Sequence, residues 1–355
     1  MTKTEEKEVN FGKSIIVPSV VELAKQPITN LPLRYVRHSP IDAHSPLLPL
    51  PVIDLHKLLS QTPSLASVEL LNLHSACKDW GFFQVINHGV STSLMETFKT
   101  EVIKLFELPI EEKKKLWQQS DNHEGFGQLF VMSEEQKLDW SDMFYITTLP
   151  PKLRRTELFH KLPSQIREAM EEYIAATKTL AVTLLHQMAK ALGIDSTEME
   201  ELFSEGLQSI RMNYYPPCPE PDKAIGFAPH SDADALTIVF QLNQTQGLEI
   251  RKDGNWVPVI PLENAFIVNI GDIMEIVSNG VYRSVEHRAT VNSTKERLSV
   301  ATFYSSNFDS ELGPAKSIIG PANPPVFRTE LAELYHKGFF ARKLSGKSYL
   351  QEMRL

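Results

Sequence analysis

Two side chains that commonly bind metals stand one residue apart in the stretch GFAPHSDADALTIVF, residues 226–240: the imidazole of His230 and the carboxylate of Asp232. An apolar, β-branched run follows them, which is typical of a strand. An imidazole and a carboxylate together suit a ferrous or a zinc ion. Such a site needs a third ligand, and the chain has 11 histidines from which to choose it.

His287 is the best candidate for the third ligand. In the run VYRSVEHRATV, residues 281–291, strand alternation places Val285, His287 and Ala289 on one apolar face. A lone inward histidine is more often a packed core residue, so this position alone does not decide. Other predicted strands also turn polar side chains inward, which favours a ligand-filled cavity inside a β-barrel.

Two predicted strands carry these inward polar groups. Strand 297–304 places three side chains on one face: Arg297, Ser299 and Phe303. Strand 208–215 does the same with Arg211, Asn213 and Tyr215. A guanidinium on an apolar face is costly without an anion, and it can hold a carboxylate through two parallel hydrogen bonds. The pattern therefore predicts a site for a dicarboxylate whose far end reaches the metal.

Two histidines and one carboxylate form the facial triad of non-haem Fe(II) oxygenases, which leaves coordination positions open for a co-substrate and O2. Zinc would accept the same ligands in a hydrolase. The Arg297–Ser299 pair favours iron, and no general base is obvious beside the metal.

The composition fits an ordinary globular protein: 355 residues, 42% hydrophobic and 23% charged. A net charge of −8 argues against a nucleic-acid-binding or basic membrane-surface protein. Cys77 and Cys218 are too few for a disulfide scaffold or a thiolate zinc site. Neither a secretory signal nor a membrane-length apolar run is present, so we expect a cytoplasmic protein.

Apolar periodicity separates a helical first half from a strand-rich second half. Helices are predicted at 17–26, 65–79, 93–106, 110–117, 163–192, 196–204 and 329–352. Strands are predicted near 52–54 and 81–90, and then at 208–215, 236–242, 247–251, 255–259, 265–270, 281–291 and 297–304. We expect 121–150 to be loop with short strands, and a turn at Gly271-Asp272. Many short strands predict an antiparallel sandwich or barrel.

Taken together, His230-x-Asp232, His287 and Arg297-x-Ser299 resemble the Fe(II)/2-oxoglutarate-dependent dioxygenase superfamily. Three stretches are similar to its plant soluble branch: WGFFQVINHGV (80–90), MNYYPPCPEP (212–221) and NIGDIMEIVSNGVYRSVEHRATVN (269–292). EGFGQ (124–128), LDWSDMF (138–144) and the C-terminal GKSYLQEMRL resemble the senescence-related and codeine/thebaine O-demethylase-like subgroup. The likeness covers nearly the whole chain.

The resemblance implies an α+β chain with a mainly β core, a double-stranded β-helix (jelly roll) flanked by helices. We expect one compact unit with four parts. These are a disordered lead at 1–12, a mainly helical region at 13–207 that adds strands to the core, the jelly-roll core at 208–310, and a helical tail and candidate lid at 311–355.

The resemblance also implies residue roles. Three residues match the iron ligands: His230, Asp232 and His287. Four match positions around 2-oxoglutarate: Arg297 and Ser299 on its distal carboxylate, Tyr215 on the same carboxylate and Asn213 near the keto-acid end. The implied reaction consumes O2 and 2-oxoglutarate with ascorbate as reductant, and releases succinate and CO2.

The substrate contacts are harder to predict. Four candidates are Phe144, Tyr145, Arg211 and Phe303, where core packing explains the aromatic residues equally well and a surface ion pair explains Arg211. We expect a monomer that hydroxylates or O-demethylates a small, largely apolar plant metabolite or hormone. A ferrous oxidase that does not use 2-oxoglutarate, and a non-catalytic small-molecule binder on the same barrel, remain the alternatives.

Overall fold

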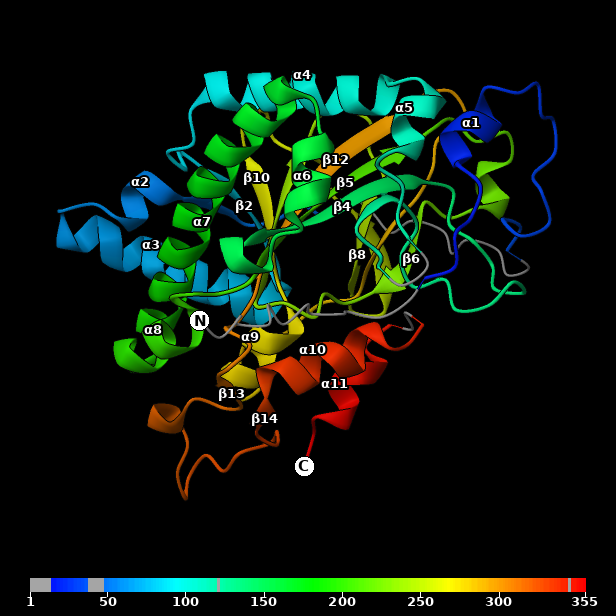
Figure 1. The fold of residues 1–355 in the computed structure, drawn as a ribbon. Helices are drawn as coiled ribbons and strands as arrows, with labels where there is room; N and C mark the ends of the chain where they lie inside the picture. The colour runs from blue at the N-terminus through cyan, green and yellow to red at the C-terminus, as the bar shows by residue number, and fades with distance from the viewer. Residues whose placement is uncertain (1–13, 38–47, 120–121, 344–345) are drawn as a thin grey trace, which may run out of the picture.

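The computed structural model describes residues 14–37, 48–119, 122–343 and 346–355. Two β-sheets face one another, with helices packed around them (Figure 1). The expected lead at 1–12 lies outside the described residues. No helix among the described residues is long and apolar enough to span a bilayer.

The larger sheet has eight strands among the described residues, in the order β1-β2-β10-β7-β12-β5-β4-β3. Neighbours are antiparallel except for β1 and β2, which are parallel. The strands are β1 (Val52–Asp54), β2 (Phe82–Ile86), β3 (Gly125–Gly127), β4 (Asp142–Leu149), β5 (Gln208–Tyr215), β7 (Leu236–Gln241), β10 (Phe266–Ile270) and β12 (Arg297–Tyr304).

The smaller sheet pairs its strands in the order β6-β11-β8-β9. They are β6 (Phe227–His230), β8 (Leu248–Lys252), β9 (Asn255–Pro258) and β11 (His287–Ala289). A separate short hairpin joins β13 (Glu311–Leu312) to β14 (Glu330–Leu331). Between the sheets, Phe82 and Ile267 of the larger sheet pack with Ile250 and Val257 of the smaller one. This apolar layer holds the two sheets together beside the site.

Helices cover the other face of the larger sheet and one end of the molecule. They are α1 (Val20–Ala24), α2 (Leu55–Leu58), α3 (Pro63–Ser75), α4 (Thr92–Glu107), α5 (Ile110–Lys114), α6 (Thr156–Lys161), α7 (Ser164–Leu192), α8 (Ser196–Phe203), α9 (Asp272–Val277), α10 (Ala332–Phe340) and α11 (Ser348–Glu352). Helix α7 buries an apolar stripe that includes Ile166, Met170 and Leu184, and Gly193 ends the helix with φ of 73°. Figure 1 shows α4 and α7 on one side of the sheets and α10 and α11 on another.

Several elements differ from the prediction, including the helix expected at 329–352, which is two shorter helices, α10 and α11. The strand expected at 281–291 is only three residues long, β11. Gly271 is the N-cap of helix α9, where a turn was expected. β4 is an eight-residue strand inside the expected loop. β6 was not predicted. Side chains explain the shortened strand. The hydroxyl of Ser278 accepts from the Tyr282 amide, and the carboxylate of Glu275 accepts from the Ser284 amide, so these backbone groups do not pair with a strand.

Candidate metal and co-substrate site

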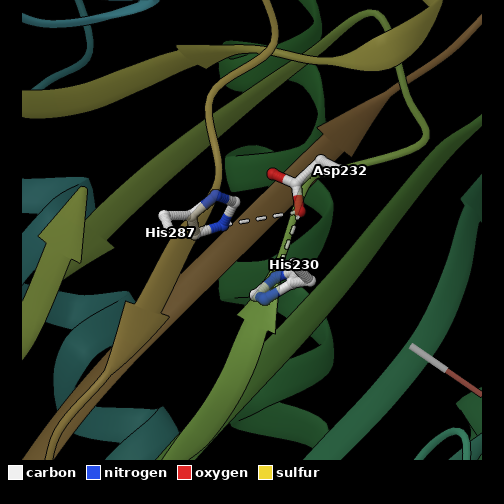
Figure 2. A group of neighbouring side chains, drawn as sticks. All are labelled: His230, Asp232 and His287. Atoms are coloured by element: carbon white, nitrogen blue, oxygen red, sulfur yellow. Dashed lines mark ion pairs between the residues drawn. The ribbon is translucent and has the colours of Figure 1, made fainter. Parts of the chain in front are cut away.

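The structure brings His230, Asp232 and His287 together at the edge of the smaller sheet. β6 and β11 are antiparallel neighbours, and His287 lies directly opposite His230. The Nε2 atoms of His230 and His287 lie 3.5 and 3.6 Å from Oδ1 of Asp232, as Figure 2 shows. One ligand atom from each residue fits within 4.8 Å of the others, and all three side chains are buried. This geometry can hold one metal ion.

Backbone carbonyls orient both imidazoles. Nδ1 of His230 lies 2.8 Å from the carbonyl oxygen of Ala228, and Nδ1 of His287 lies 3.1 Å from that of Val285. A carbonyl oxygen only accepts, so each Nδ1 carries the proton and each Nε2 keeps a lone pair for a metal. Burial and the neighbouring His230 lower the pKa of His287 to about 4, which keeps this imidazole neutral.

The two oxygen atoms of the Asp232 carboxylate have different neighbours. Its Oδ2 accepts hydrogen bonds from the Thr237 hydroxyl (2.6 Å) and the Asn269 amide (2.8 Å). Its Oδ1 faces the two histidines. Burial alone would raise the pKa of Asp232, but the facing His287 and His230 outweigh it and hold the pKa below its usual range. An ionised carboxylate with one free oxygen beside two imidazole Nε2 atoms fits a divalent cation such as Fe(II).

Arg297 and Ser299 lie between the sheets, where strand alternation placed them. β12 pairs with β5 so that Arg297 is opposite Tyr215 and Ser299 is opposite Asn213. The guanidinium of Arg297 donates to Gln241 Oε1 (3.0 Å) and Ser299 Oγ (3.4 Å), and its Cζ lies 5.1 Å from the centre of the Tyr215 ring.

Arg297 is buried, with 4% of the residue exposed, and its charge is not balanced by a neighbouring carboxylate among the described residues. Within the described part of the chain no carboxylate forms an ion pair with Arg297, and its Nε has no hydrogen-bond partner. Asn213 Oδ1 is buried and unpartnered in the same way. Because an uncompensated buried cation is strongly unfavourable, the arrangement fits an anion bound at Arg297.

A cavity with a free volume of about 40 Å³ borders the metal candidates. Besides His230 and Asp232, its lining includes Tyr145, Arg211, Phe227, Phe303, Phe339 and Phe340. Arg211 is buried, with its Cζ 3.8 Å from the centre of the Phe227 ring, so the surface ion pair considered for it does not exist.

Phe144 does not reach this cavity. It is fully buried on the opposite side of β4, where its ring lies 5.1 Å from that of Phe126. Neighbouring residues of a strand point to opposite faces, so Phe144 and Tyr145 cannot both line the cavity. Of the two, the structure places Tyr145 at the cavity and Phe144 in the core.

Several site residues were missed by sequence reasoning. Phe339 and Phe340 come from α10, far from the strands, and no local pattern connects them to the site. Thr237 and Asn269 could have been found, because each is a polar residue inside an otherwise apolar predicted strand.

Comparisons with known proteins agree with this geometry. Residues 206–306 match the 2OG-Fe(II) oxygenase superfamily, and residues 50–169 match the N-terminal region named for a non-haem dioxygenase in morphine synthesis. The chain is 52% identical over 347 residues to oxoglutarate-dependent flavonoid 7-O-demethylase 1 of Ocimum basilicum, covering 97% of this chain and 93% of that protein. It belongs to the 2-oxoglutarate- and Fe(II)-dependent oxygenases.

Two further relatives of this oxygenase extend the comparison. Codeine O-demethylase of Papaver somniferum is 47% identical over 354 residues, which covers 98% of each chain. The crystal structure of JOX2 in complex with 2OG, Fe and JA superposes with a TM-score of 0.87 at 34% identity, covering 97% of this chain and 99% of that one. The expected jelly-roll fold and the plant dioxygenase family are thereby confirmed.

Proposed function

We propose that this oxygenase removes the methyl group of an O-methylated aromatic plant metabolite. Fe(II) is held by His230, Asp232 and His287. The distal carboxylate of 2-oxoglutarate is held by Arg297 and Ser299, with Tyr215 and Asn213 beside it. The observation that carries the proposal is the aromatic cavity that opens directly onto His230 and Asp232. The flavonoid and codeine O-demethylases among the relatives support the choice of a methoxy carbon.

The reaction is balanced without a further oxidant. The substrate R–OCH3, O2 and 2-oxoglutarate give R–OH, formaldehyde, succinate and CO2. One oxygen atom of O2 enters succinate. The other is inserted into a methyl C–H bond, and the resulting hemiacetal breaks its C–O bond to release formaldehyde. O2 is the oxidant; Fe(II), when bound, would activate it, and 2-oxoglutarate would supply two of the electrons that reduce it.

The chain's own residues bind 2-oxoglutarate and the substrate, orient them, and exclude water from the cavity. Arg297 offers two N–H groups to one carboxylate, which fixes the direction in which 2-oxoglutarate extends toward the metal. Phe227, Phe303 and Phe340 give the cavity apolar walls that hold an aromatic ring and exclude water. The backbone-bonded Nδ1 atoms of the two histidines keep both Nε2 atoms aimed at one point.

Arg211 supports a second candidate, hydroxylation of a small carboxylic acid. Its guanidinium lines the cavity, is buried, and has an unpartnered Nε. Asp139 and Asp232 act on Arg211 electrostatically but form no direct ion pair with it among the described residues, and a substrate carboxylate or phenolate could form one. The crystal structure of the related JOX2 in complex with 2OG, Fe and JA supports this candidate.

A metabolite panel separates these candidates. The protein is incubated with Fe(II), 2-oxoglutarate and ascorbate and with O-methylated flavonoids, methoxylated alkaloids, or small carboxylic acids. We expect a product lacking CH2, with formaldehyde and succinate formed in equal amounts. A product with one added oxygen from an acid would favour the second candidate. Substrate oxidation without succinate would favour a ferrous oxidase that does not use 2-oxoglutarate, and binding without O2 consumption would favour a non-catalytic binder.

The proposal includes ascorbate as the reductant, a monomer and a cytoplasmic location. It also assigns catalysis to 208–310 and cavity closure to the tail at 311–355. Three measurements test the first three points separately. The dependence of turnover number on ascorbate tests the reductant, the mass in solution tests the monomer, and the location of a tagged full-length chain tests the cytoplasmic location.

A further inference from the structure

The C-terminal segment runs directly past the metal-binding strand. Gly346 forms a parallel bridge with His230: its amide donates to the Pro229 carbonyl (3.3 Å), and its carbonyl accepts from the Ser231 amide (3.4 Å). Upstream, the Tyr335 hydroxyl of α10 donates to the carbonyl of Ala233, one residue after Asp232. The tail therefore contacts residues 229–233 at two points.

The same segment completes the cavity wall. Phe339 and Phe340 at the end of α10 line the cavity, and the Phe340 ring stacks 5.6 Å from that of Phe130. A cavity of about 40 Å³ is far smaller than the roughly 300 Å³ or more of typical small-molecule sites. A substrate of ordinary size therefore needs part of this wall to move.

One buried carboxylate fixes this segment to the core. Glu275 lies on α9, with its side chain 3% exposed. Its Oε2 accepts from Lys347 Nζ (2.7 Å) and its Oε1 accepts from Arg354 NH2 (3.1 Å). Lys347 also donates to the carbonyl of Ser284 (2.6 Å). Two cations of the tail thus converge on one acid of the core.

Helix α9 connects this contact to the metal site. The Asp272 amide at its start donates to the Asp232 carbonyl (2.8 Å), and the Ser231 hydroxyl donates to the Asp272 carboxylate (3.1 Å). Residues 231–232, at the proposed metal site, and the C-terminal tail are therefore attached to the same short helix, α9. Neither Glu275 nor its two partners belongs to the cavity lining or to the metal ligands.

We propose that Glu275 is a positioning residue for the substrate: by binding Lys347 and Arg354 it holds the tail so that Phe339 and Phe340 close the cavity. The inference rests on the proposed function only for the expected change in the substrate KM. Losing the contact lowers the fraction of molecules with a completed cavity wall, which weakens apparent substrate affinity by that fraction. The metal ligands keep their own hydrogen bonds and are not affected.

The test compares core and tail variants of the full-length chain. Glu275→Gln keeps the shape and the bond to the Ser284 amide but removes the charge. The double variant Lys347→Met/Arg354→Met removes the contact from the tail and leaves the core unchanged. We expect both to raise the substrate KM by about tenfold while kcat and the KM for 2-oxoglutarate change less than about twofold. Lys347→Arg should retain wild-type KM.

A matched control is Lys316→Met, which removes an exposed ion pair between Lys316 and Glu311 in the tail but outside α10. It should leave the substrate KM unchanged. Amide hydrogen exchange of the anaerobic Fe(II)- and 2-oxoglutarate-loaded protein gives a readout that needs no turnover. Residues 332–340 should exchange faster in Glu275→Gln and in the double variant, and as in wild type in Lys316→Met.

The outcomes are separable. Unchanged exchange in α10, or a loss of kcat at unchanged KM, overturns the assignment of Glu275. If the wild-type protein turns over no compound of the panel, the proposed function fails, and the exchange of residues 332–340 still decides whether Glu275 holds the tail.

Discussion

The hydroxyl of Thr237 donates a hydrogen bond of 2.6 Å to Oδ2 of Asp232. Thr237 is directly opposite Asn269 in the antiparallel pair β7 and β10, and Asn269 donates to the same oxygen. With Oδ2 occupied by two donors, the carboxylate presents Oδ1 to His230 and His287. The larger sheet thus orients the carboxylate of Asp232, a proposed metal ligand, toward the two histidines of the smaller sheet.

Removing the Thr237 hydroxyl should weaken metal binding. Thr237→Val is nearly isosteric, but it leaves Oδ2 of Asp232 with one donor instead of two. We expect the affinity for Fe(II) to fall by about 10- to 100-fold, as for other hydrogen-bond partners of metal ligands. Competition with a chelator under anaerobic conditions measures it. Thr237→Ser keeps the hydroxyl and should bind Fe(II) like wild type, and equal affinities for Val and Ser would contradict the argument.

Arg297 should determine the affinity for 2-oxoglutarate. Arg297→Lys keeps the positive charge but removes the forked pair of N–H donors. Hydrogen bonds to charged groups contribute about 1.5–3 kcal/mol each, so the KM for 2-oxoglutarate should rise by roughly 10- to 100-fold. Succinate formation at varied 2-oxoglutarate measures this KM.

The neighbouring hydroxyl provides the control for Arg297. Ser299→Ala removes one weaker donor and keeps the guanidinium, so its KM should rise less than that of Arg297→Lys. Fe(II) affinity should be the same in both variants and in wild type. An Arg297→Lys enzyme with an unchanged KM for 2-oxoglutarate would show that the anion binds elsewhere.

Gly247 offers an indirect test of the same site. A Cβ added there would lie 2.8 Å from Cδ of Arg297 and 3.0 Å from the Thr290 carbonyl oxygen. Gly247→Ala should therefore displace the guanidinium and raise the KM for 2-oxoglutarate by about tenfold, since one lost charged hydrogen bond is about 1.5 kcal/mol. Gly320→Ala, where nothing lies within 4 Å of an added Cβ, is the matched control. Equal KM values for the two variants would contradict this placement.

Strand alternation was sufficient to find the polar residues of β5 and β12. The two strands pair in register over their whole lengths, so Arg297, Ser299, Asn213 and Tyr215 meet as their positions in the sequence predict. The metal ligands were predicted from residue type and spacing. Their convergence depends on β6, a four-residue strand that contains Pro229 and gives almost no pattern.

Other parts of the site could not be predicted from local pattern. The run at 281–286 alternates like a strand, but its backbone groups bond to Ser278 and Glu275, which a periodicity argument does not include. The approach of α10 and Gly346 to the cavity depends on a long-range contact with Glu275. Contacts of this kind are determined by tertiary packing, and the spacing of residues in the sequence does not predict them.

His336 should make the protein less stable in mild acid. It lies on α10, 1% exposed, with Nε2 2.9 Å from Ser305 Oγ and with Nδ1 unpartnered. Burial lowers the pKa of His336 from 6.5 to about 3. Between these values the unfolded chain binds a proton that the folded chain does not, so the free energy of unfolding decreases as pH falls from about 6.5 toward about 3.

The effect of this one residue appears as a difference between two proteins. His336→Gln does not titrate, so the free energy of unfolding of wild type minus that of the variant should fall by about 1 kcal/mol between about pH 6 and about pH 5. Urea denaturation at each pH measures both terms, and other titrating groups cancel because both proteins contain them. His186→Gln, at an exposed position of α7, is the control and should show no such fall. A pH-independent difference for His336→Gln would mean that the imidazole binds its proton equally well in the folded and the unfolded protein, which its burial and its apolar neighbour Phe308, 5.1 Å away, make unfavourable.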